Sequence, residues 1–255
     1  MEIEIKNLSR SFEINGSHLP VLENISFSVS NGEFLTIIGP SGCGKSTILN
    51  ILAGFIKPDS GEIYLDGKRV RNLQNVTAYM VQKDLLLQWR TVLSNTILAP
   101  ELRGDELKKA KREATNLLES FGLSGFLNSY PSELSGGMRQ RVALARTLMF
   151  KRPLLLLDEP FGALDAMTRF VLQNLLINVW QKYKKTVIFV THDIDEALLL
   201  SDRIIVLSAR PAKIKSIYRI SEKRPRDLAS LAELKKTIFD ELKEEMEKVF
   251  NNGKV

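Results

Sequence analysis

The sequence predicts an α/β fold built on a mostly parallel sheet. Short apolar runs alternate with segments of helical periodicity, and this order places helices on the faces of a parallel sheet. The runs are Phe34–Ile38, Leu154–Leu157, Val187–Thr191 and Ile204–Leu207. Between the first two runs, a helix-rich stretch interrupts the alternation. We therefore expect an α/β core with a helical insertion at residues 83–151.

Residues 1–82, the first part of this core, predict strands joined by turns. Apolar residues alternate with acids at positions 3–5 and with polar residues at positions 25–29, which is the period of a half-buried strand. Asp66-Gly67 follows the short run Glu62–Leu65 and signals a tight hairpin turn. Thr77–Val81 is a further strand candidate. The start of the chain is thus predicted to be rich in strands.

Helical spacing dominates the insertion and the tail. Apolar residues recur three and four apart within Glu106–Phe121, and a second helix is expected from Gly137 to Phe150. Residues 152–208 return to alternating strands and helices and form the second part of the core. The tail, residues 209–255, ends in an amphipathic helix at 228–250, with room for one break. We interpret its apolar stripe as packing on the chain's own core, with a partner-binding stripe as the alternative.

Composition excludes several classes of protein. The 255 residues are 44% hydrophobic and 26% charged, which is typical of a globular chain. A single cysteine, Cys43, rules out an intramolecular disulfide, and we interpret it as a small residue that fits its loop rather than as a catalytic thiol. The start lacks the apolar stretch of a signal peptide, and no apolar run approaches the ~18–20 residues of a membrane span. We expect an intracellular protein that does not itself cross a membrane.

The net charge of +6 is concentrated near the end of the chain. Residues 209–226 hold seven basic residues and one acid, so the remaining residues sum to about zero. A basic balance invites a nucleic-acid or membrane-surface partner. The plain interpretation of this segment is a solvated strand and loop. The sharper hypothesis is that it faces anionic lipid headgroups.

A glycine-rich loop joins a strand to a helix early in the chain. The segment GPSGCGKST, residues 39–47, follows Phe34–Ile38 and precedes Ile48–Leu52, the context that a phosphate-binding loop requires. Glycines turn backbone N–H groups toward phosphate oxygens, and the helix N-terminus adds positive potential. We expect Lys45 to contact β- and γ-phosphates and Ser46 to ligate Mg²⁺. The predicted phosphate-binding residues are Gly39, Ser41, Gly42, Cys43, Gly44, Lys45, Ser46 and Thr47.

Two carboxylates end the apolar run Leu154–Leu157. Asp158 and Glu159 follow it directly, and the carboxyl end of a buried strand is where α/β sheets bind ligands. Adjacent strand residues point to opposite faces, so the two acids need separate roles. We expect Asp158 to hold Mg²⁺ beside the phosphate loop and Glu159 to orient and polarise an attacking water.

The segment Leu134–Arg141 completes a series of motifs. It resembles the LSGGQ signature of ABC transporter ATPases, with Met138 in place of the usual Gln. Further family motifs match in order: Phe12 the aromatic that stacks on adenine, Gln82 the Q-loop glutamine, Gly162–Asp165 the D-loop and His192 the switch histidine. The resemblance covers roughly residues 1–208.

This resemblance implies a P-loop NTPase (RecA-like) core with an antiparallel β subdomain and an inserted α-helical subdomain. Its cofactors would be ATP and Mg²⁺. The signature of one copy would face the phosphate loop of a second copy, so that ATP is sandwiched between two chains. The site residues implied are Glu159, His192, Gln82 and Lys45 for catalysis, Ser46, Gln82 and Asp158 for the metal, and Phe12, Ser135, Gly136, Gly137 and Asp165 for the nucleotide beside the phosphate loop.

Several of these residues have simpler interpretations. Phe12 could be a core aromatic, Gln82 an ordinary polar residue at a strand end, and His192 a structural histidine. Gly136 and Gly137 open a helix rich in arginine, and a helix N-terminus of this kind is an anion site. The arginines are Arg139, Arg141 and Arg146.

Local features are similar to those of nitrate/sulfonate/taurine importer ATPases. Residues 82–92 resemble the stretch after that group's Q-loop, with Gln88 where a proline is usual. Residues 210–214 and 224–226 resemble its C-terminal pattern, with Ala212 where a glycine is common. The resemblance implies the ATP-hydrolysing subunit of a membrane importer, bound to the cytoplasmic face of the membrane. Its partners would be permease subunits and, indirectly, an extracytoplasmic solute-binding protein.

An apolar cluster after the Q-loop fits permease docking. Leu85, Leu86, Leu87 and Trp89 lie where, in the family, a short cytoplasmic helix of the permease binds. The alternative is that they form the core of the insertion. We expect both, with some leucines buried and Trp89 nearer the surface.

The alternative function is a soluble ABC-type ATPase that acts on nucleic acid, which the basic net charge alone would favour. Repair ATPases of the family place long coiled coils between the phosphate loop and the signature, yet only about 89 residues separate Lys45 from Leu134 here. Translation-type members carry two cassettes in one chain, and this chain has one. We therefore expect no nucleic-acid partner.

Overall fold

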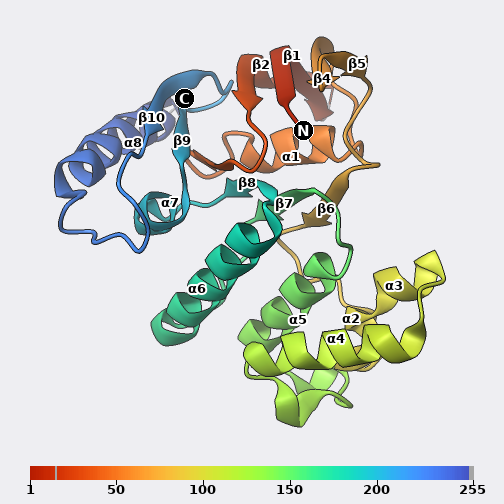
Figure 1. Cartoon of the computed structure of the whole chain (residues 1–255). Coiled ribbons are helices and arrows are strands. Elements are labelled where there is room, and N and C mark those ends of the chain that lie inside the picture. The colour runs from red at the N-terminus through yellow and green to blue at the C-terminus, as the bar shows by residue number, and fades with distance from the viewer. Residues whose placement is uncertain (15, 253–255) are drawn as a thin grey trace.

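The computed structural model describes residues 1–14 and 16–252 and arranges them around two sheets (Figure 1). The larger sheet has six strands, and its neighbours are parallel except for the antiparallel pair β10 and β9. In spatial order the strands are β10 (Ile214–Arg219), β9 (Arg203–Leu207), β3 (Phe34–Ile38), β8 (Thr186–Val190), β7 (Leu154–Asp158) and β6 (Thr77–Met80). The predicted α/β fold with a mostly parallel sheet is confirmed.

The smaller sheet is antiparallel and belongs to the N-terminal part of the chain. Its strands, in spatial order, are β2 (Ser17–Val29), β1 (Ile3–Ile14), β4 (Ser60–Leu65) and β5 (Lys68–Val70). Leu65 pairs with Lys68 across the two-residue turn Asp66-Gly67. Both turn residues have positive φ, 49° and 74°, as this tight hairpin turn requires. The predicted hairpin is therefore confirmed.

The stretch between β6 and β7 is helical. It contains α2 (Val92–Thr96), α3 (Leu98–Arg103), α4 (Leu107–Ser120) and α5 (Gly136–Leu148), with short 3-10 turns at Ser124–Phe126 and Pro131–Glu133. The helices predicted near 106–121 and 137–150 are confirmed, within two residues at each end. In Figure 1 this group lies to one side of the sheets. The division of the chain at residues 82, 151 and 208 stays a prediction.

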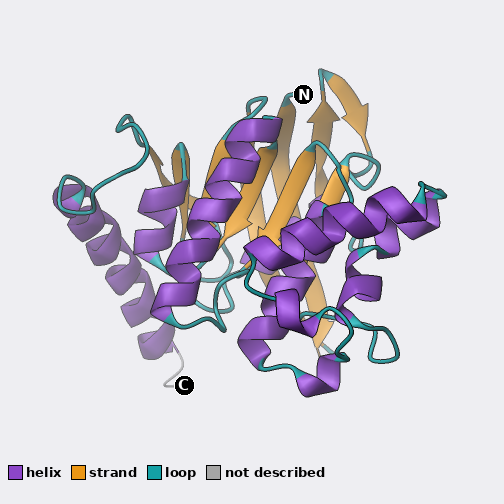
Figure 2. Cartoon of the chain, turned by 60° about the horizontal axis from the view of Figure 1, so that its bottom comes forward, coloured by secondary structure: helices purple, strands orange, loops and turns teal. Residues whose placement is uncertain are grey.

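Both faces of the six-stranded sheet are covered: helices lie in front of one face in Figure 2, and packing shows the cover of the other. Alternate residues of β3 show this, because Leu35 and Ile37 pack toward α1 (Lys45–Leu52) and the antiparallel sheet, whereas Phe34 packs among residues of α5 and α6 (Ala166–Tyr183). Strands buried on both faces are continuously apolar, which is why the sequence presents them as unbroken runs.

The tail folds back onto the sheet. Helix α8 (Ala232–Asn252) runs without interruption, so the one break that the sequence allowed is absent from it. Leu231 and Ile238 are buried with α7 (Ile194–Leu200) and β9. This contact supports the interpretation of the apolar stripe as core packing. Among the described residues, no helix combines the length and apolar character that crossing a membrane requires.

Candidate functional site

A hollow of about 560 Å³ lies where several strands of the large sheet end. Phe12 lines one side of it, the phosphate loop forms the floor, and Gln82, Glu159 and His192 complete the rim. The last three follow β6, β7 and β8 respectively, and the carboxyl ends of parallel strands meet at one edge of a sheet. The sheet thus brings together site residues that lie far apart in the sequence.

The phosphate loop has the tight backbone that its glycines suggested. Gly44 has φ 123°, and a Cβ there would lie 2.7 Å from Leu22 Cδ2, so only glycine fits both the angle and the space. The buried Lys45 ammonium donates hydrogen bonds to the carbonyls of Gly39 and Pro40, at 2.8 and 3.0 Å. The loop therefore holds the lysine at its centre.

Gly39 and Cys43 are buried residues of the phosphate loop. Cys43 is buried, and a Cβ on Gly39 would lie 3.0 Å from the Cys43 Sγ atom. Burial raises the pKa of the Cys43 thiol, more than the nearby Lys45 charge lowers it. A thiol kept protonated and out of solvent is inert, which agrees with its interpretation as a small residue that fits the loop.

Asp158, at the end of β7, meets the chemical requirements of a metal ligand. It is buried, its Oδ1 has no hydrogen-bond partner among the described residues, and its Oδ2 is 3.5 Å from the hydroxyl of Tyr79. Burial raises the pKa of Asp158, and a hydrogen bond from Ser46 opposes that rise. An unpartnered buried carboxylate oxygen beside a serine hydroxyl is an oxygen donor set of the kind Mg²⁺ prefers. The residues present fit this ion.

Glu159 joins the two sides of the rim. Its Oε2 lies 3.3 Å from Gln82 Nε2 and 3.2 Å from His192 Nδ1. The backbone N–H of Glu159 donates to Val190 O at 2.9 Å, and Gln140 Nε2 donates to the Glu159 carbonyl at 3.3 Å. Glu159 also has a φ of 47°, which turns the chain sharply as it leaves β7. The carboxylate is therefore fixed at the mouth of the hollow.

Phe12 lies between the core of the antiparallel sheet and the hollow. The ring is half-buried against the core of the antiparallel sheet, yet it also lines the hollow. The Arg10 guanidinium carbon lies 4.8 Å from the ring centroid. The guanidinium therefore covers one face of the ring.

The signature and D-loop residues lie outside this hollow. Ser135 Oγ caps α5 by accepting from the N–H of Met138 at 3.2 Å, and Asp165 caps α6 by accepting from Thr168 at 3.0 Å. Both residues and Gly136 are exposed. Within one chain, then, the sequence-predicted nucleotide-binding residues form two separate surfaces.

The signature arginines are engaged inside the chain. Arg139 pairs with Asp84 at 3.1 Å, Arg146 donates to the carbonyls of Asp84 and Leu85, and Arg141 donates to Phe121 O. Two of these arginines, Arg139 and Arg146, therefore attach the segment after Gln82 to α5. That the N-terminus of α5 is an anion site stays a prediction.

Sequence reasoning missed one charged residue of the hollow, Arg210. Its side chain lines the pocket with Leu19 and Val21. The loop that carries it lies beside β2, where Ala212 N donates to Val21 O at 2.8 Å. The family-like stretch 210–214 includes this arginine, but nothing near it in the sequence indicates the hollow, since its position results from a pairing between residues almost two hundred positions apart.

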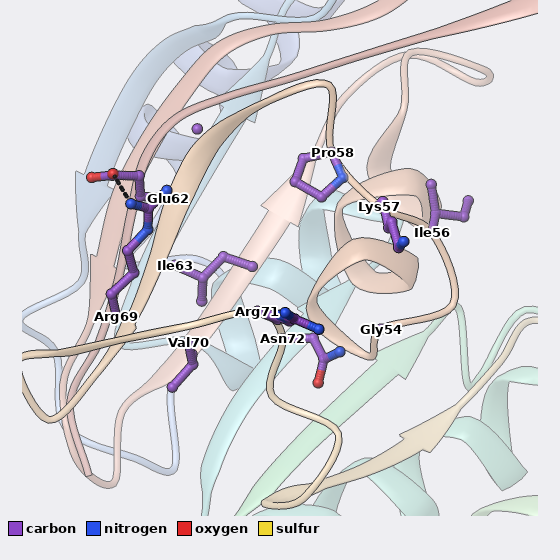
Figure 3. Close-up of a pocket in the computed structure, with 11 residues that line it drawn as sticks. Gly54, Ile56, Lys57, Pro58, Glu62, Ile63, Arg69, Val70, Arg71 and Asn72 are labelled. Carbon is purple, nitrogen blue, oxygen red and sulfur yellow. Dashed lines mark ion pairs between the residues drawn. The ribbon is translucent and has the colours of Figure 1, made fainter.

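A second hollow, of about 540 Å³, contains none of the predicted site residues. Figure 3 shows it between the end of α1 and the β4–β5 hairpin, with Lys57, Arg69 and Arg71 around it. Arg69 is paired with Glu62 at 3.0 Å. This second hollow contains neither the phosphate loop nor Asp158 and Glu159. The candidate site is therefore the first hollow.

The fold and the first hollow together define a nucleotide-binding P-loop ATPase. Residues 22–162 match the ABC transporter family model. The chain is 47% identical, over 96% of its length and 93% of the relative's, to an ABC transporter ATP-binding protein of Methanocaldococcus jannaschii. It therefore belongs to the ABC transporter family, as an ATP-binding subunit.

Other similarities narrow the group and support the fold. The aliphatic sulfonates import ATP-binding protein SsuB of Bacillus cereus is 43% identical over 94% of this chain and 96% of its own. The taurine import ATP-binding protein TauB of Roseobacter denitrificans is 42% identical over 86% of this chain and 82% of its own. A dimeric structure of the ATP-binding cassette MJ0796 bound to ADP and Pi superimposes with a TM-score of 0.78, at 30% identity, over 87% of this chain and all of that one.

Proposed function

We propose that this chain hydrolyses ATP to energise a membrane importer of sulfonate- or taurine-type solutes. The observation that carries the ATPase assignment is the Glu159 carboxylate, held between Gln82 and His192 at the mouth of the phosphate-loop hollow. A carboxylate in this place can accept a proton from a water aimed at the terminal phosphate. The solute class follows from the relatives named for sulfonate and taurine import.

The predicted site residues have distinct roles in this proposal. The loop N–H groups and Lys45 bind the β- and γ-phosphates, and Phe12 stacks on the adenine. Ser46, Asp158 and Gln82 would hold Mg²⁺, which supplies charge neutralisation to the phosphates. Glu159 orients the attacking water and takes its proton as the terminal P–O bond breaks, while His192 donates to the γ-phosphate.

The completed site requires a second copy of the chain. Ser135, Gly136 and Asp165 are exposed and lie outside the hollow, as expected if they contact nucleotide held by a partner. The similar cassette MJ0796 is dimeric in the solved structures. Closure of two copies around two nucleotides would be driven by contacts that exist only while the γ-phosphate is present.

The segment after Gln82 supplies a surface for the permease. Leu86 is buried in the core of the insertion, whereas Leu85 is 61% and Trp89 75% exposed. Of the three leucines Leu86 alone is buried and Trp89 is exposed, which agrees with the expected mixture of a buried part and an exposed tryptophan. Exposed apolar residues of this kind mark a protein contact, and we propose that they bind permease subunits at the cytoplasmic face of the membrane. An extracytoplasmic solute-binding protein would deliver the solute to that complex.

Co-purification with the permease tests this function. We expect the chain to sediment with membranes only when its permease is co-produced, and its ATPase activity to rise when binding protein loaded with a sulfonate is added. Trp89→Ser should abolish sedimentation, whereas Phe239→Ser, at an aromatic residue on α8 that is 55% exposed, should not. Sedimentation that ignores the permease, or stimulation by nitrate or a pyrimidine but no sulfonate, would contradict the importer or its solute class respectively.

A further inference from the structure

We propose that Arg210, from the tail of the chain, binds the phosphates of the nucleotide, and that Glu245 of α8 positions it there. This proposal rests on the ATPase function above and adds a residue to its site. It also gives the tail, which lies beyond the ATPase motifs, a direct part in nucleotide binding.

The first step is the position of Arg210. It lines the same hollow as Ser41, Lys45 and Glu159. Its loop is fixed on both sides of Ala212, whose N–H donates to Val21 O at 2.8 Å and whose carbonyl accepts from Glu23 N at 3.0 Å. Val21 in turn lies against the phosphate loop, since a Cβ on Gly44 would be 2.9 Å from Val21 Cγ1. The loop that carries Arg210 is therefore held beside the phosphate loop.

The second step is charge. Among the other basic residues of 209–226, Lys213 pairs with Glu23, Lys215 with Glu244 and Glu245, and Arg224 with Asp202. Arg210 forms no hydrogen bond or ion pair with any residue that the structure describes. An exposed guanidinium that keeps its five donors at a phosphate-binding hollow matches the geometry of a phosphate group. ATP is the polyanion that the proposed function brings to this place.

The third step is the attachment of the loop to α8. The backbone N–H of Ala209, next to Arg210, donates to Glu245 Oε2 at 2.8 Å. Glu245 is buried and also pairs with Lys215 at 2.9 Å and Lys248 at 2.6 Å. Its carboxylate therefore fixes the start of the Arg210 loop from the last helix. Glu245 does not line the hollow, so its role is positioning.

Equilibrium titration of the full chain with Mg²⁺-ATP, Mg²⁺-ADP and adenosine tests the role of Arg210. Arg210→Ala should weaken ATP and ADP binding about fivefold, the scale of one partly exposed charged hydrogen bond, and leave adenosine binding unchanged. Arg210→Lys should restore part of the loss. Arg219→Ala, at an exposed arginine of the same segment, should bind all three ligands as the unmodified chain does.

Two results would overturn this role without touching the ATPase function. The first is an Arg210→Ala chain that binds ATP within twofold of the unmodified chain; the second is an equal loss of adenosine binding. If the unmodified chain bound no ATP, the proposed function would fail together with this inference. The melting temperature of each variant without nucleotide separates a lost contact from a damaged fold.

A matched pair of glutamates tests the positioning role. Glu244 pairs with Lys215 and Lys248, as Glu245 does, but Glu245 alone accepts from Ala209. Glu245→Ala should therefore weaken ATP binding, whereas Glu244→Ala should not. Glu245→Gln keeps an oxygen for Ala209 and should retain most of the affinity, even if Glu245→Ala folds poorly.

A double-mutant cycle gives a readout that general destabilisation would not move. In the Arg210→Ala background, Glu245→Ala should cause no further loss of ATP affinity, because its effect acts through Arg210. Additive losses in the double variant would overturn the positioning role, and so would a Glu245→Gln chain as weak as Glu245→Ala.

Discussion

At the residue scale, one carboxylate connects the two sides of the candidate site. Glu159 contacts Gln82 and His192 through the same oxygen, at 3.3 and 3.2 Å. Gln82 leads into the helical insertion and His192 follows β8. A general base needs a fixed position more than any other property, and these contacts with the sharp turn at its backbone supply that position.

Replacement of this carboxylate separates binding from turnover. We expect Glu159→Gln to retain ATP affinity within about threefold, since the amide is nearly isosteric, and to lower turnover by about 10²–10⁴-fold, the range for loss of a general base. The variant should also accumulate closed dimer in ATP, visible by size-exclusion chromatography. Lys45→Ala is the contrasting variant, because it should weaken binding of the nucleotide itself. Hydrolysis near the normal rate in Glu159→Gln would contradict the assignment of the base.

Most of the site could be predicted from residues because its chemistry is local. The loop at 39–47, the acids after β7 and His192 after β8 each follow an apolar strand, and the sheet brings such strand ends together. Arg210 could not be found in this way. Its place depends on the contact of its loop with Val21 on β2, a long-range pairing that the local resemblance of residues 210–214 does not indicate.

At the element scale, the segment after Gln82 is tied to the signature helix. Arg139 pairs with Asp84 at 3.1 Å, and Arg146 donates to the carbonyls of Asp84 and Leu85. Leu85, with φ 45°, also belongs to the exposed apolar surface proposed for the permease. A shift of Gln82 toward nucleotide would therefore move α5 and the docking surface together.

The element boundaries followed from the sequence wherever packing and turn chemistry agree. The apolar runs of the large sheet and the Asp66-Gly67 hairpin were predictable for that reason. The tail was less so: α8 begins at Ala232 rather than 228 and has no break. Periodicity alone cannot separate a turn that packs apolar residues, such as Leu231, from the first turn of a helix.

The attachment of α8 to β10 predicts a pH dependence of stability. Burial would raise the pKa of Glu245, but hydrogen bonds from Lys248, the Ala209 amide and Lys215 outweigh it and lower the pKa to about 2, from an ordinary 4.5. A lowered pKa stabilises the fold above about pH 4.5, and this contribution is lost as the pH falls toward 2.

We expect Glu245→Ala to cost about 1–2 kcal/mol of unfolding free energy at pH 7, less than the full shift implies because Lys248 is half-exposed. The difference from the unmodified chain should shrink between pH 4.5 and 2.5, as measured by urea unfolding at each pH. Measuring the difference cancels the titration of other carboxylates. A constant difference across this range would show that Glu245 stabilises by packing rather than charge.

At the scale of the whole molecule, the two halves of the proposed nucleotide site lie on separate surfaces of one chain. The hollow holds the phosphate loop and Glu159, and the exposed Ser135 lies outside it at the start of α5. If two copies contribute one half each to a shared site, a chain with a damaged phosphate loop and a chain with a damaged signature should together form one active site.

Mixed dimers test this exchange. Ser135→Arg and Lys45→Ala should each be inactive alone, whereas an equal mixture should recover about a quarter of normal ATPase activity, because half the dimers are mixed and each of those keeps one complete site. The measurement is phosphate release at fixed total protein. No recovery in the mixture would count against the sandwich arrangement.

The contacts of the basic segment, residues 209–226, change the interpretation of the net charge. Three of the seven basic residues that suggested a polyanionic partner pair with carboxylates of the chain: Lys213 with Glu23, Lys215 with Glu244 and Glu245, and Arg224 with Asp202. Arg226 donates to the carbonyls of Leu198 and Ser201. These contacts favour the tail as a structural element over a lipid- or nucleic-acid-binding face.

The burial of Cys43 has a practical consequence for measuring how two copies of the chain approach each other. It is the one cysteine of the sequence, it is only 1% exposed, and burial raises the pKa of its thiol, so thiol reagents should leave it unmodified in the folded chain. A fluorophore or spin label could therefore be attached at an introduced cysteine on the solvent-facing start of α5 without first removing a native thiol. The native sequence is already a suitable background for measuring how far two copies approach each other in each nucleotide state.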